Sequence, residues 1–421
     1  MRDKLLQLGF GARRSSGSGE TSGRARVVYL DHVANWSGGE IALARLLPAL
    51  AGAIEPIVIL ADDGPLCGHL RDLGIAVEVV PMGRSLRDLR RSEGWTISKA
   101  ARAVVGFSAY AVRLRGRLRQ LAPAVVHGNS LKASVYGLIA AKGAGIPFVW
   151  HLRDRLASDY LPSRAAFALR LLARFGPDLV IANSEATRRT LMGGTPVCVV
   201  YDGVVPDGDG TRAGASYGAS SEEHGLRIGM VGRISPWKGQ HVFLEAFASA
   251  FRGKEGVEAR IIGDAMFGEE EYAAELRERV RQLGIEAQVR FRGFRADVAA
   301  ELASLDILVH ASIVPEPFGM VIVEGMAAGL AVVASDAGGV REIVENGKSG
   351  LLVAAGDGAE LGAVLVTLSG SKSLRRSLGA EAEVASRRFG VEAASSAIVE
   401  IYKVLVPGLQ TGARGCLAKK A

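Results

Sequence analysis

The stretch LRIGMVGRISPWKGQHVFLEAFASA, residues 226–250, decides the fold class. Its first six residues suit a buried strand, turn residues follow, and residues 240–250 repeat apolar side chains at helical spacing. A strand that passes through a short loop into a helix is the repeating unit of a parallel sheet, because parallel strands need crossover connections. This stretch therefore predicts an α/β domain.

The same alternation continues on both sides of this stretch. Strands are expected upstream at 26–30, 57–60, 77–80, 125–126, 148–150 and 179–182, and downstream at 259–262, 289–291, 307–310, 331–334 and 351–353. Residues 202–225 interrupt the pattern with Gly, Ser, Asp and Pro, which indicates a domain boundary. We expect two facing, doubly wound Rossmann-like domains with an inter-domain cleft, where the strand ends and helix starts would bind ligands.

The pattern predicts five segments in the chain of 421 residues. They are a flexible basic tail at 1–24, an N-terminal Rossmann-like domain at 25–200, a linker at 201–225, a C-terminal Rossmann-like domain at 226–395, and a C-terminal helix and tail at 396–421.

Composition excludes several protein classes. A hydrophobic content of 48% excludes a wholly disordered chain. The three cysteines lie far apart without a CxxC pair, which argues against a disulfide framework or a thiolate zinc site. No apolar run reaches the ~18 residues that a membrane span needs, and the first residues lack a secretory signal. We expect a protein that is cytoplasmic or peripheral on the inner face of the plasma membrane.

Charge is unevenly distributed along the chain. The net charge is +7, yet residues 1–200 hold 27 Lys and Arg against 15 Asp and Glu, whereas the remainder holds 24 against 29. Residues 99–121 combine an apolar helical stripe with many arginines. Such a helix either lies on an anionic membrane or packs its stripe on the domain core with solvated arginines. An aromatic content of 6% offers few base-stacking side chains for a nucleic-acid binder.

Two familiar phosphate-binding fingerprints are absent. No G-x-G-x-x-G follows any expected strand. The segment Gly347-Lys348-Ser349 imitates the end of a P-loop, but Glu342 stands where the first glycine belongs and a strand follows instead of a helix. We interpret this segment as a turn.

The motif EPFGMVIVE, residues 316–324, is the strongest chemical signal. Gly319 lets the backbone approach a ligand, and the N–H groups at the start of the following helix favour an anion. Glu316 lies in the loop and Glu324 about one and a half turns into the helix, so both can reach one polyhydroxylated ligand. Carboxylates suit sugar hydroxyls because they accept several hydrogen bonds. The alternative is a helix-start glutamate beside an unrelated solvated one.

Two loops after strands offer groups that bind phosphate. VGRISPWKG, residues 231–239, places Arg233 and Lys238 on one strand-to-helix loop, and two converging cations are what a diphosphate requires. The loop Ser37-Gly38-Gly39-Glu40 follows the first strand, and its backbone could also bind phosphate. The alternatives are a solvated basic loop and a plain tight turn.

Together these motifs resemble glycosyltransferase family 4, retaining enzymes of the GT-B fold. The tracts Ile261–Asp264, Phe291–Phe294, Ser335–Val340 and Asn346–Val353 fit the same family. The resemblance extends from about residue 26 to 400, densely in the second half and thinly in the first. It departs at Asp202-Gly203-Val204, where the family usually has Asn-Gly-Val, and after the glycine loop, where Glu40 and Ile41 follow with no basic residue.

The resemblance implies a role for each matching residue. Glu316, His151, Arg233 and Lys238 would be catalytic, and the nucleotide-sugar would be held by Gly38, Gly39, Arg233, Lys238, Gly293, Arg295, Glu316, Phe318, Gly319, Met320, Val321 and Glu324. Within that set, the cations would bind the donor diphosphate, Glu324 the ribose, Glu316 and the backbone of 318–321 the donor sugar, and Gly293 with Arg295 the base. His127 lies at another strand end, and His310 is expected to be buried packing.

The family implies that the transferred sugar keeps its anomeric configuration, with the departing phosphate helping to deprotonate the acceptor and with no metal or cofactor. The expected activity moves a sugar from a nucleotide-diphosphate sugar to a glycan, lipid-linked or small-molecule acceptor, in polysaccharide or glycolipid biosynthesis. The N-terminal domain would bind the acceptor. The alternatives are a sugar-nucleotide epimerase of similar architecture and a non-catalytic nucleotide binder.

Overall fold

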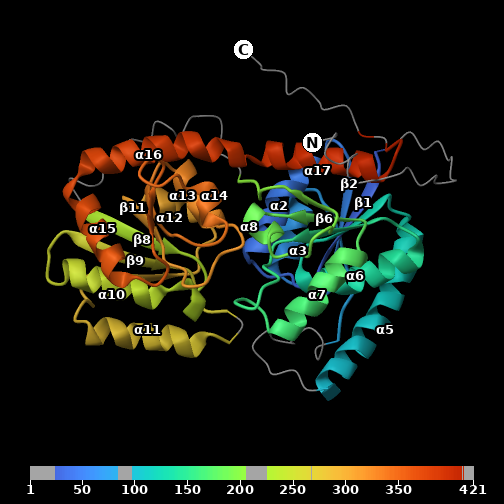
Figure 1. The fold of residues 1–421 in the computed structure, drawn as a ribbon, viewed down its shortest axis with the longest axis horizontal. Helices are drawn as coiled ribbons and strands as arrows, with labels where there is room; N and C mark the ends of the chain where they lie inside the picture. Colours follow the sequence, from blue (N-terminus) through green and yellow to red (C-terminus); the bar gives the residue numbers. More distant parts are fainter. Residues whose placement is uncertain (1–23, 84–96, 205–224, 267, 410, 412–421) are drawn as a thin grey trace, which may run out of the picture. The chain divides into compact units, whose positions relative to one another are not determined.

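The structure is a computed structural model that describes residues 24–83, 97–204, 225–266, 268–409 and 411. The described residues form two compact units (Figure 1). Unit 1 takes the described part of Met1–Gly203 and of Val391–Ala421, and unit 2 takes that of Val204–Gly390. Nearly all of the expected basic tail and most of the expected linker lie outside the described residues.

Unit 1 is built on a parallel sheet that has seven strands among the described residues, in the order β3-β2-β1-β4-β5-β6-β7. The strands are β1 Arg26–Asp31, β2 Glu55–Leu60, β3 Ala76–Val79, β4 Val125–Gly128, β5 Phe148–Leu152, β6 Leu179–Ala182 and β7 Val197–Val199. Six of them were predicted. The seventh, β7, is three half-buried residues at the sheet edge and gives too short an apolar run to detect.

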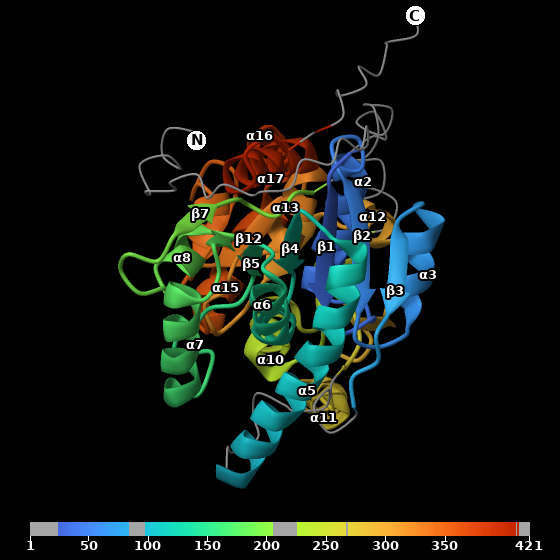
Figure 2. The ribbon, with the colours of Figure 1, turned by 90° about the vertical axis from the view of Figure 1, so that its right-hand side faces the viewer.

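Helices cover both faces of this sheet. They are α2 Gly38–Leu50, α3 Pro65–Asp72, α5 Ile97–Leu121, α6 Leu131–Ala144, α7 Ser163–Phe175, α8 Glu185–Arg188 and α17 Val391–Leu405. Alternate side chains of β1 enter different cores, because successive residues of a strand point to opposite faces. Tyr29 packs with α2 and α17, whereas Val28 and Leu30 pack with α5 and α6. Figure 2 shows the ribbons of these helices around the strands of unit 1.

The helix α17 corrects the predicted boundary at residue 395. That position falls inside one continuous helix, and the structure places all of this helix in unit 1. Ile398 and Tyr402 are fully buried in the same core as Tyr29. The amphipathic pattern of the helix predicts a buried stripe but does not show which core will cover it.

Unit 2 repeats the architecture with a parallel sheet of six strands among its described residues, in the order β10-β9-β8-β11-β12-β13. The strands are β8 Leu226–Val231, β9 Val257–Ile262, β10 Val289–Gly293, β11 Ile307–His310, β12 Ala331–Ser335 and β13 Leu351–Val353. The helices are α10 Gln240–Phe251, α11 Glu270–Gln282, α12 Val298–Ala303, α13 Met320–Ala327, α14 Val340–Ile343, α15 Gly358–Gly370 and α16 Lys372–Ser386, with 3-10 turns η2 Pro236–Lys238 and η3 Arg387–Phe389.

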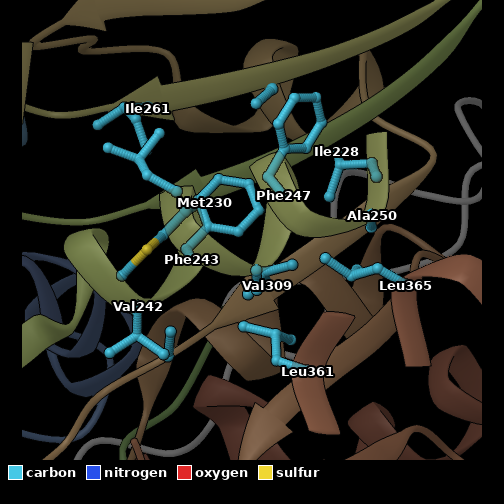
Figure 3. Close-up of a cluster of buried hydrophobic side chains, with 14 of the residues drawn as sticks. Ile228, Met230, Val242, Phe243, Phe247, Ala250, Ile261, Val309, Leu361 and Leu365 are labelled. Atoms are coloured by element: carbon cyan, nitrogen blue, oxygen red, sulfur yellow. The ribbon is translucent and has the colours of Figure 1, made fainter. Parts of the chain in front are cut away.

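The core of unit 2 forms where β8 meets α10 and α15. Figure 3 shows Met230 of β8 beside Phe243 and Phe247 of α10, with Leu361 and Leu365 of α15 in the same cluster. All five side chains are buried. These residues confirm the α/β class predicted from residues 226–250.

Some local expectations change. Gly38 and Gly39 form the first turn of α2, which begins two residues before the expected helix at Glu40, so they are a helix start and not a loop. The segment Gly347–Ser349 is a turn, as predicted. Within the described residues, no helix has both the length and the apolar character that crossing a membrane requires.

Candidate functional site

Two cations of unit 2 lie on the loop between β8 and α10. Arg233 follows the strand, and Lys238 ends the turn η2. Gly239 comes next with a φ of 78°, and a Cβ there would lie 2.0 Å from the backbone oxygen of Ala311. Only glycine therefore lets this loop pack so closely against the segment that follows β11. That packing brings Lys238 next to the expected glutamate motif.

Glu316 is the centre of the unit 2 cluster. Its Oε1 pairs with the Lys238 ammonium, accepts a hydrogen bond of 2.7 Å from Ser312 Oγ and lies 3.2 Å from His310 Nε2. Burial of Glu316 would raise the pKa of its carboxyl, but Lys238 and His310 outweigh burial and hold that pKa well below its usual range. The carboxylate is ionised at neutral pH and can accept hydrogen bonds from hydroxyl groups.

His310 was predicted to be buried packing only. It is buried, but its hydrogen bond to Glu316 makes it part of the site. Sequence reasoning missed both His310 and Ser312 as partners of the glutamate. Their spacing along the chain could have indicated them, since His310 ends β11, Ser312 follows it by two residues and Glu316 follows Ser312 by four.

The Lys238–Glu316 pair lies at the switch point of the unit 2 sheet. Lys238 follows β8 and Glu316 follows β11, and these neighbouring strands are where the strand order reverses direction. Ligands of doubly wound sheets bind at the carboxyl ends of such strands. The pair therefore marks a candidate ligand site on chemical and topological grounds.

Arg233 pairs with a carboxylate that the sequence did not single out. Its Nε lies 3.4 Å from Glu269 Oε2, and Ser235 Oγ donates to the other oxygen of Glu269 at 2.5 Å. Both cations also flank one indole: Lys238 Nζ lies 4.4 Å and Arg233 Cζ 5.9 Å from the centroid of Trp237. Two cations beside one aromatic ring form a surface on which an anion can bind.

The helix α13 starts beside Glu316. Gly319 caps it with a φ of 120°, and Glu324 lies half-buried within the helix. Phe318 is buried, and its ring centroid lies 5.5 Å from that of Phe389. Its side chain therefore packs in the interior, and only its backbone can contact a ligand. A Cβ on Gly338 would lie 2.2 Å from the backbone oxygen of Glu316, so glycine is needed where these loops meet.

The segment after β10 contains the two residues expected near a base. Gly293 ends the strand with a φ of 68°, and its backbone oxygen accepts from the N–H of Gly263 at 2.9 Å. Arg295 Nε lies 3.3 Å from Glu301, a carboxylate that Arg292 also holds. This ion pair joins Arg295 to α12, the helix that contains Glu301.

His151 occupies a buried polar cluster in unit 1, at the end of β5. It lines a small pocket with Arg153 and Asp202, together with Ala42, Leu46, Val200, Tyr201, Gly203, Ala394 and Ile398. Arg153 Nε donates to Asp202 at 2.8 Å, and Asn183 donates to the same carboxylate at 3.1 Å. Burial, followed by the charge of Arg153, holds the pKa of His151 well below its usual range, so its ring is neutral.

Glu40 is a buried acid in the same region. Burial, then the neighbouring charge of Asp31, raises the pKa of Glu40 to about 8. Its carboxyl bonds with Ser37, the residue that caps α2. The expected phosphate-binding loop thus has a protonated carboxyl one residue beyond Gly39 at neutral pH.

Two family models match most of the chain between them. "Glycosyltransferase Family 4" matches residues 36–207, and "Glycosyl transferases group 1" matches residues 219–384. A D-inositol 3-phosphate glycosyltransferase of Streptomyces bingchenggensis is 30% identical over 307 residues, which are 68% of this chain and 67% of that protein. The chain belongs to glycosyltransferase family 4.

Two other proteins are also similar to this chain. A phosphatidyl-myo-inositol mannosyltransferase of Mycobacterium leprae is 33% identical over 230 residues, 53% of this chain and 59% of that relative's length. The crystal structure of Anabaena Alr3699/HepE in complex with UDP-glucose is 29% identical, with a TM-score of 0.76 over 90% of this chain and 99% of that one. The described units have the GT-B type of architecture that family 4 implies.

The expected site residues therefore fall into two groups. Arg233, Lys238, Glu316 and the α13 start gather in unit 2, where Gly293 ends a strand of the same sheet. His151 lies in unit 1, as do the glycines that begin α2. Glu269 was missed because nothing in its local sequence shows that it reaches Arg233, 36 residues earlier in the numbering.

Proposed function

We propose that the chain is a retaining glycosyltransferase that moves a sugar from a nucleotide-diphosphate sugar to a glycan, lipid-linked or small-molecule acceptor in polysaccharide or glycolipid biosynthesis. The ion pair of Lys238 with buried Glu316 at the switch point of unit 2 carries this proposal. An ammonium suits a diphosphate and an ionised carboxylate suits sugar hydroxyls, and here they stand in contact. Membership of family 4 and the likeness to Alr3699/HepE with its UDP-glucose support it.

Each group would act on a different part of the donor. Arg233 and Lys238 neutralise the diphosphate as negative charge develops on it, which lowers the barrier to its departure. Glu316 holds the donor sugar with the backbone of 318–321, Glu324 holds the ribose, and Gly293 with Arg295 lies beside the base. The Gly38–Gly39 helix start would offer further N–H groups to phosphate.

Retention follows if the acceptor attacks the face from which the diphosphate leaves. The departing phosphate then takes the acceptor proton, and no protein nucleophile is needed. Arg233 and Lys238 supply the positive charge in this scheme, so we propose a reaction that requires neither metal nor cofactor.

The first test is turnover with candidate donors. The purified chain is incubated with UDP-, GDP- and ADP-sugars and an acceptor extract, and release of nucleoside diphosphate is measured with and without EDTA. Nuclear magnetic resonance of the product's anomeric carbon reports retention or inversion. Isomerisation of the donor without an acceptor would instead establish the epimerase alternative, and binding without any turnover would establish the non-catalytic one.

We further propose that unit 1 binds an anionic membrane surface, where a lipid-linked acceptor would be found. Its helices α5, α6 and α7 carry eleven Lys and Arg and no Asp or Glu. Large apolar side chains are exposed on the outer helices: Val105 and Val112 on α5, Phe167 and Phe175 on α7. Each pair is seven or eight residues apart, so it shares one helix face. Apolar side chains among cations are typical of helices at lipid interfaces.

The membrane proposal is tested by co-sedimentation with vesicles of phosphatidylcholine, alone or with phosphatidylglycerol. We expect binding only to the anionic vesicles, weakened by Phe175→Asp and by salt. Val384→Asp, at a site in unit 2 that is 60% exposed, is the matched control. Equal binding by Phe175→Asp and the control would refute this surface.

A further inference from the structure

Four buried side chains of unit 1 form a continuous hydrogen-bonded chain that ends at His151. Tyr29 Oη lies 2.8 Å from Tyr402 Oη, which lies 2.7 Å from His127 Nδ1. His127 Nε2 then lies 3.1 Å from His151 Nδ1. The chain links β1, α17, β4 and β5, so residues that are far apart in sequence meet at one sheet end.

The far end of this chain is open. His151 Nε2 is buried without a hydrogen-bond partner among the described residues, and the nearest carboxylate oxygen, on Asp202, is 3.9 Å away. Both His151 and Asp202 line the unit 1 pocket. A buried polar atom that lacks a partner in a pocket is a place where a ligand can supply one.

The direction of the chain can be deduced because each link needs one donor and one acceptor. Both imidazoles are neutral, since burial and then the charge of Arg153 hold the pKa of His127 and of His151 well below the usual range. A neutral imidazole has one donor and one acceptor nitrogen. A hydroxyl can also accept two hydrogen bonds while its own hydrogen points elsewhere. Three arrangements of protons therefore satisfy all three links.

In the first arrangement, Tyr29 donates to Tyr402, Tyr402 to His127, and His127 to His151. The spare N–H is then on His151 Nε2, in the pocket and toward the Asp202 carboxylate. In the second, every donor is reversed. The spare donor is then the hydroxyl of Tyr29, fully buried in an apolar core, and His151 turns a lone pair toward the carboxylate. In the third, Tyr402 accepts from both Tyr29 and His127. The spare donor is then the hydroxyl of Tyr402, buried in the same core, and His151 again turns a lone pair toward the carboxylate.

The first arrangement is favoured on two counts. It does not leave a donor unsatisfied in the apolar core, which is costly, and it orients an N–H dipole favourably toward a negative charge. We propose that Tyr29, Tyr402 and His127 are positioning residues that hold His151 as the Nε2–H tautomer. His151 then presents a hydrogen-bond donor, and not a base, to an oxygen of a bound glycosyl ligand.

This inference rests on the proposed function for the identity of the ligand, but the tautomer itself does not. It also assigns a reason for α17 to belong to unit 1, because Tyr402 reaches His127 from that helix. A His151 that only donates cannot deprotonate an acceptor. The proton must then go to another group, which agrees with a departing phosphate as the base.

The first experiment reads the tautomer directly. Long-range proton–nitrogen correlation spectra of the full chain with ¹⁵N-labelled histidine distinguish the two neutral forms, and His151→Gln identifies the resonances of His151. We expect the Nε2–H pattern without any ligand. An Nδ1–H pattern would overturn the proposal, whether or not the chain proves to be a glycosyltransferase.

The second experiment separates positioning from packing with two variants of His127. In His127→Gln the amide can donate to His151 and accept from Tyr402, whereas His127→Leu can only pack. We expect His127→Leu to lower kcat by about two- to tenfold, the size of one hydrogen bond, with the donor KM little changed, and His127→Gln to retain most of kcat. If His127 only packs, Leu should match or exceed Gln, and that order would overturn the relay.

The two experiments keep the failures distinct. Absence of transfer in the wild-type chain with every donor would refute the proposed function, while the spectra would still decide the tautomer. Transfer together with an Nδ1–H tautomer would refute the relay alone.

Discussion

We expect the ion pair of Lys238 and Glu316 to contribute both to the stability of unit 2 and to activity. Two variants can separate these contributions. In Lys238→Ala the buried carboxylate loses its cation and keeps Ser312 and His310. Removing one partner of a buried pair costs about 3–5 kcal/mol. The Lys238 side chain is 18% exposed and that of Glu316 8%, and two hydrogen bonds remain, so we expect about 3 kcal/mol. A typical domain would remain folded after such a loss.

The double variant Lys238→Ala/Glu316→Gln removes the uncompensated charge. We expect it to recover at least about 1 kcal/mol relative to Lys238→Ala, because residues in contact are coupled by amounts of this size. Activity should not recover. Both variants lack the cation that we propose to bind the diphosphate, and removing one such group costs about 10²- to 10³-fold in kcat.

The assay is urea unfolding, monitored through the hydrogen exchange of peptides from β8 and β11, so that the stability of unit 2 is measured by itself. Nucleoside diphosphate release measures activity on the same samples. Lys348→Ala is the control, because its exposed pair with Glu345 should contribute under about 1 kcal/mol. A change below 1 kcal/mol for Lys238→Ala, or a double variant no more stable than the single one, would refute the assignment of a buried pair.

Three further predictions use other contacts. Gly239→Ala should destabilise unit 2 by about 2–5 kcal/mol in urea unfolding, because the new Cβ would sit at a positive φ and overlap the backbone of Ala311. Gly253→Ala is the control: its φ is 74° but the space around it is open, so it should cost only about 1–2 kcal/mol. Equal losses of stability in the two variants would contradict the overlap. Glu269→Gln should lower the donor KM by up to about fivefold by releasing Arg233 from an ion pair, and exposed Glu270→Gln should not change it. The pKa of Glu40 is raised to about 8 in the folded chain, from about 4.3 when unfolded. As pH rises between these values, Glu40 loses its proton in the unfolded chain but keeps it in the folded one, so the stability of unit 1 falls. Thermal melts should show this fall, and Glu40→Gln should remove it.

The strand pattern of both units could be predicted because it is local. Buried runs such as 26–30 and 226–231 are apolar and bounded by turn residues, so each strand is visible in its own sequence. The membership of α17 could not be predicted in this way. Its stripe would fit either core, and Tyr402 finds Tyr29, 373 residues away, only in the folded unit.

The candidate site divides along the same line. Glu316, Arg233 and Lys238 could be predicted because each lies in a motif of nine residues that can be recognised from its own sequence. Their partners were not predicted. Glu269 becomes visible as a partner only when loops after separate strands meet, since contacts between such loops leave no local signature. Ser312 lies only four residues before Glu316, so its spacing did carry a local signal.

The departure at Asp202 shows how a contact changes the interpretation of a residue. By sequence, an aspartate where the family has asparagine only loosens the assignment. In unit 1 this carboxylate receives Arg153 Nε at 2.8 Å and an amide hydrogen of Asn183 at 3.1 Å, and it lies 3.9 Å from His151 Nε2. Arg153 donates to one oxygen of Asp202 and Asn183 to the other, whereas an asparagine has a single acceptor oxygen and could not accept at both positions. It would also leave the buried guanidinium without its charge partner. Asp202 and Arg153 are therefore best understood as a matched pair, and the Asp202 carboxylate adds to the relay through His127 in favouring the Nε2–H tautomer that we propose for His151.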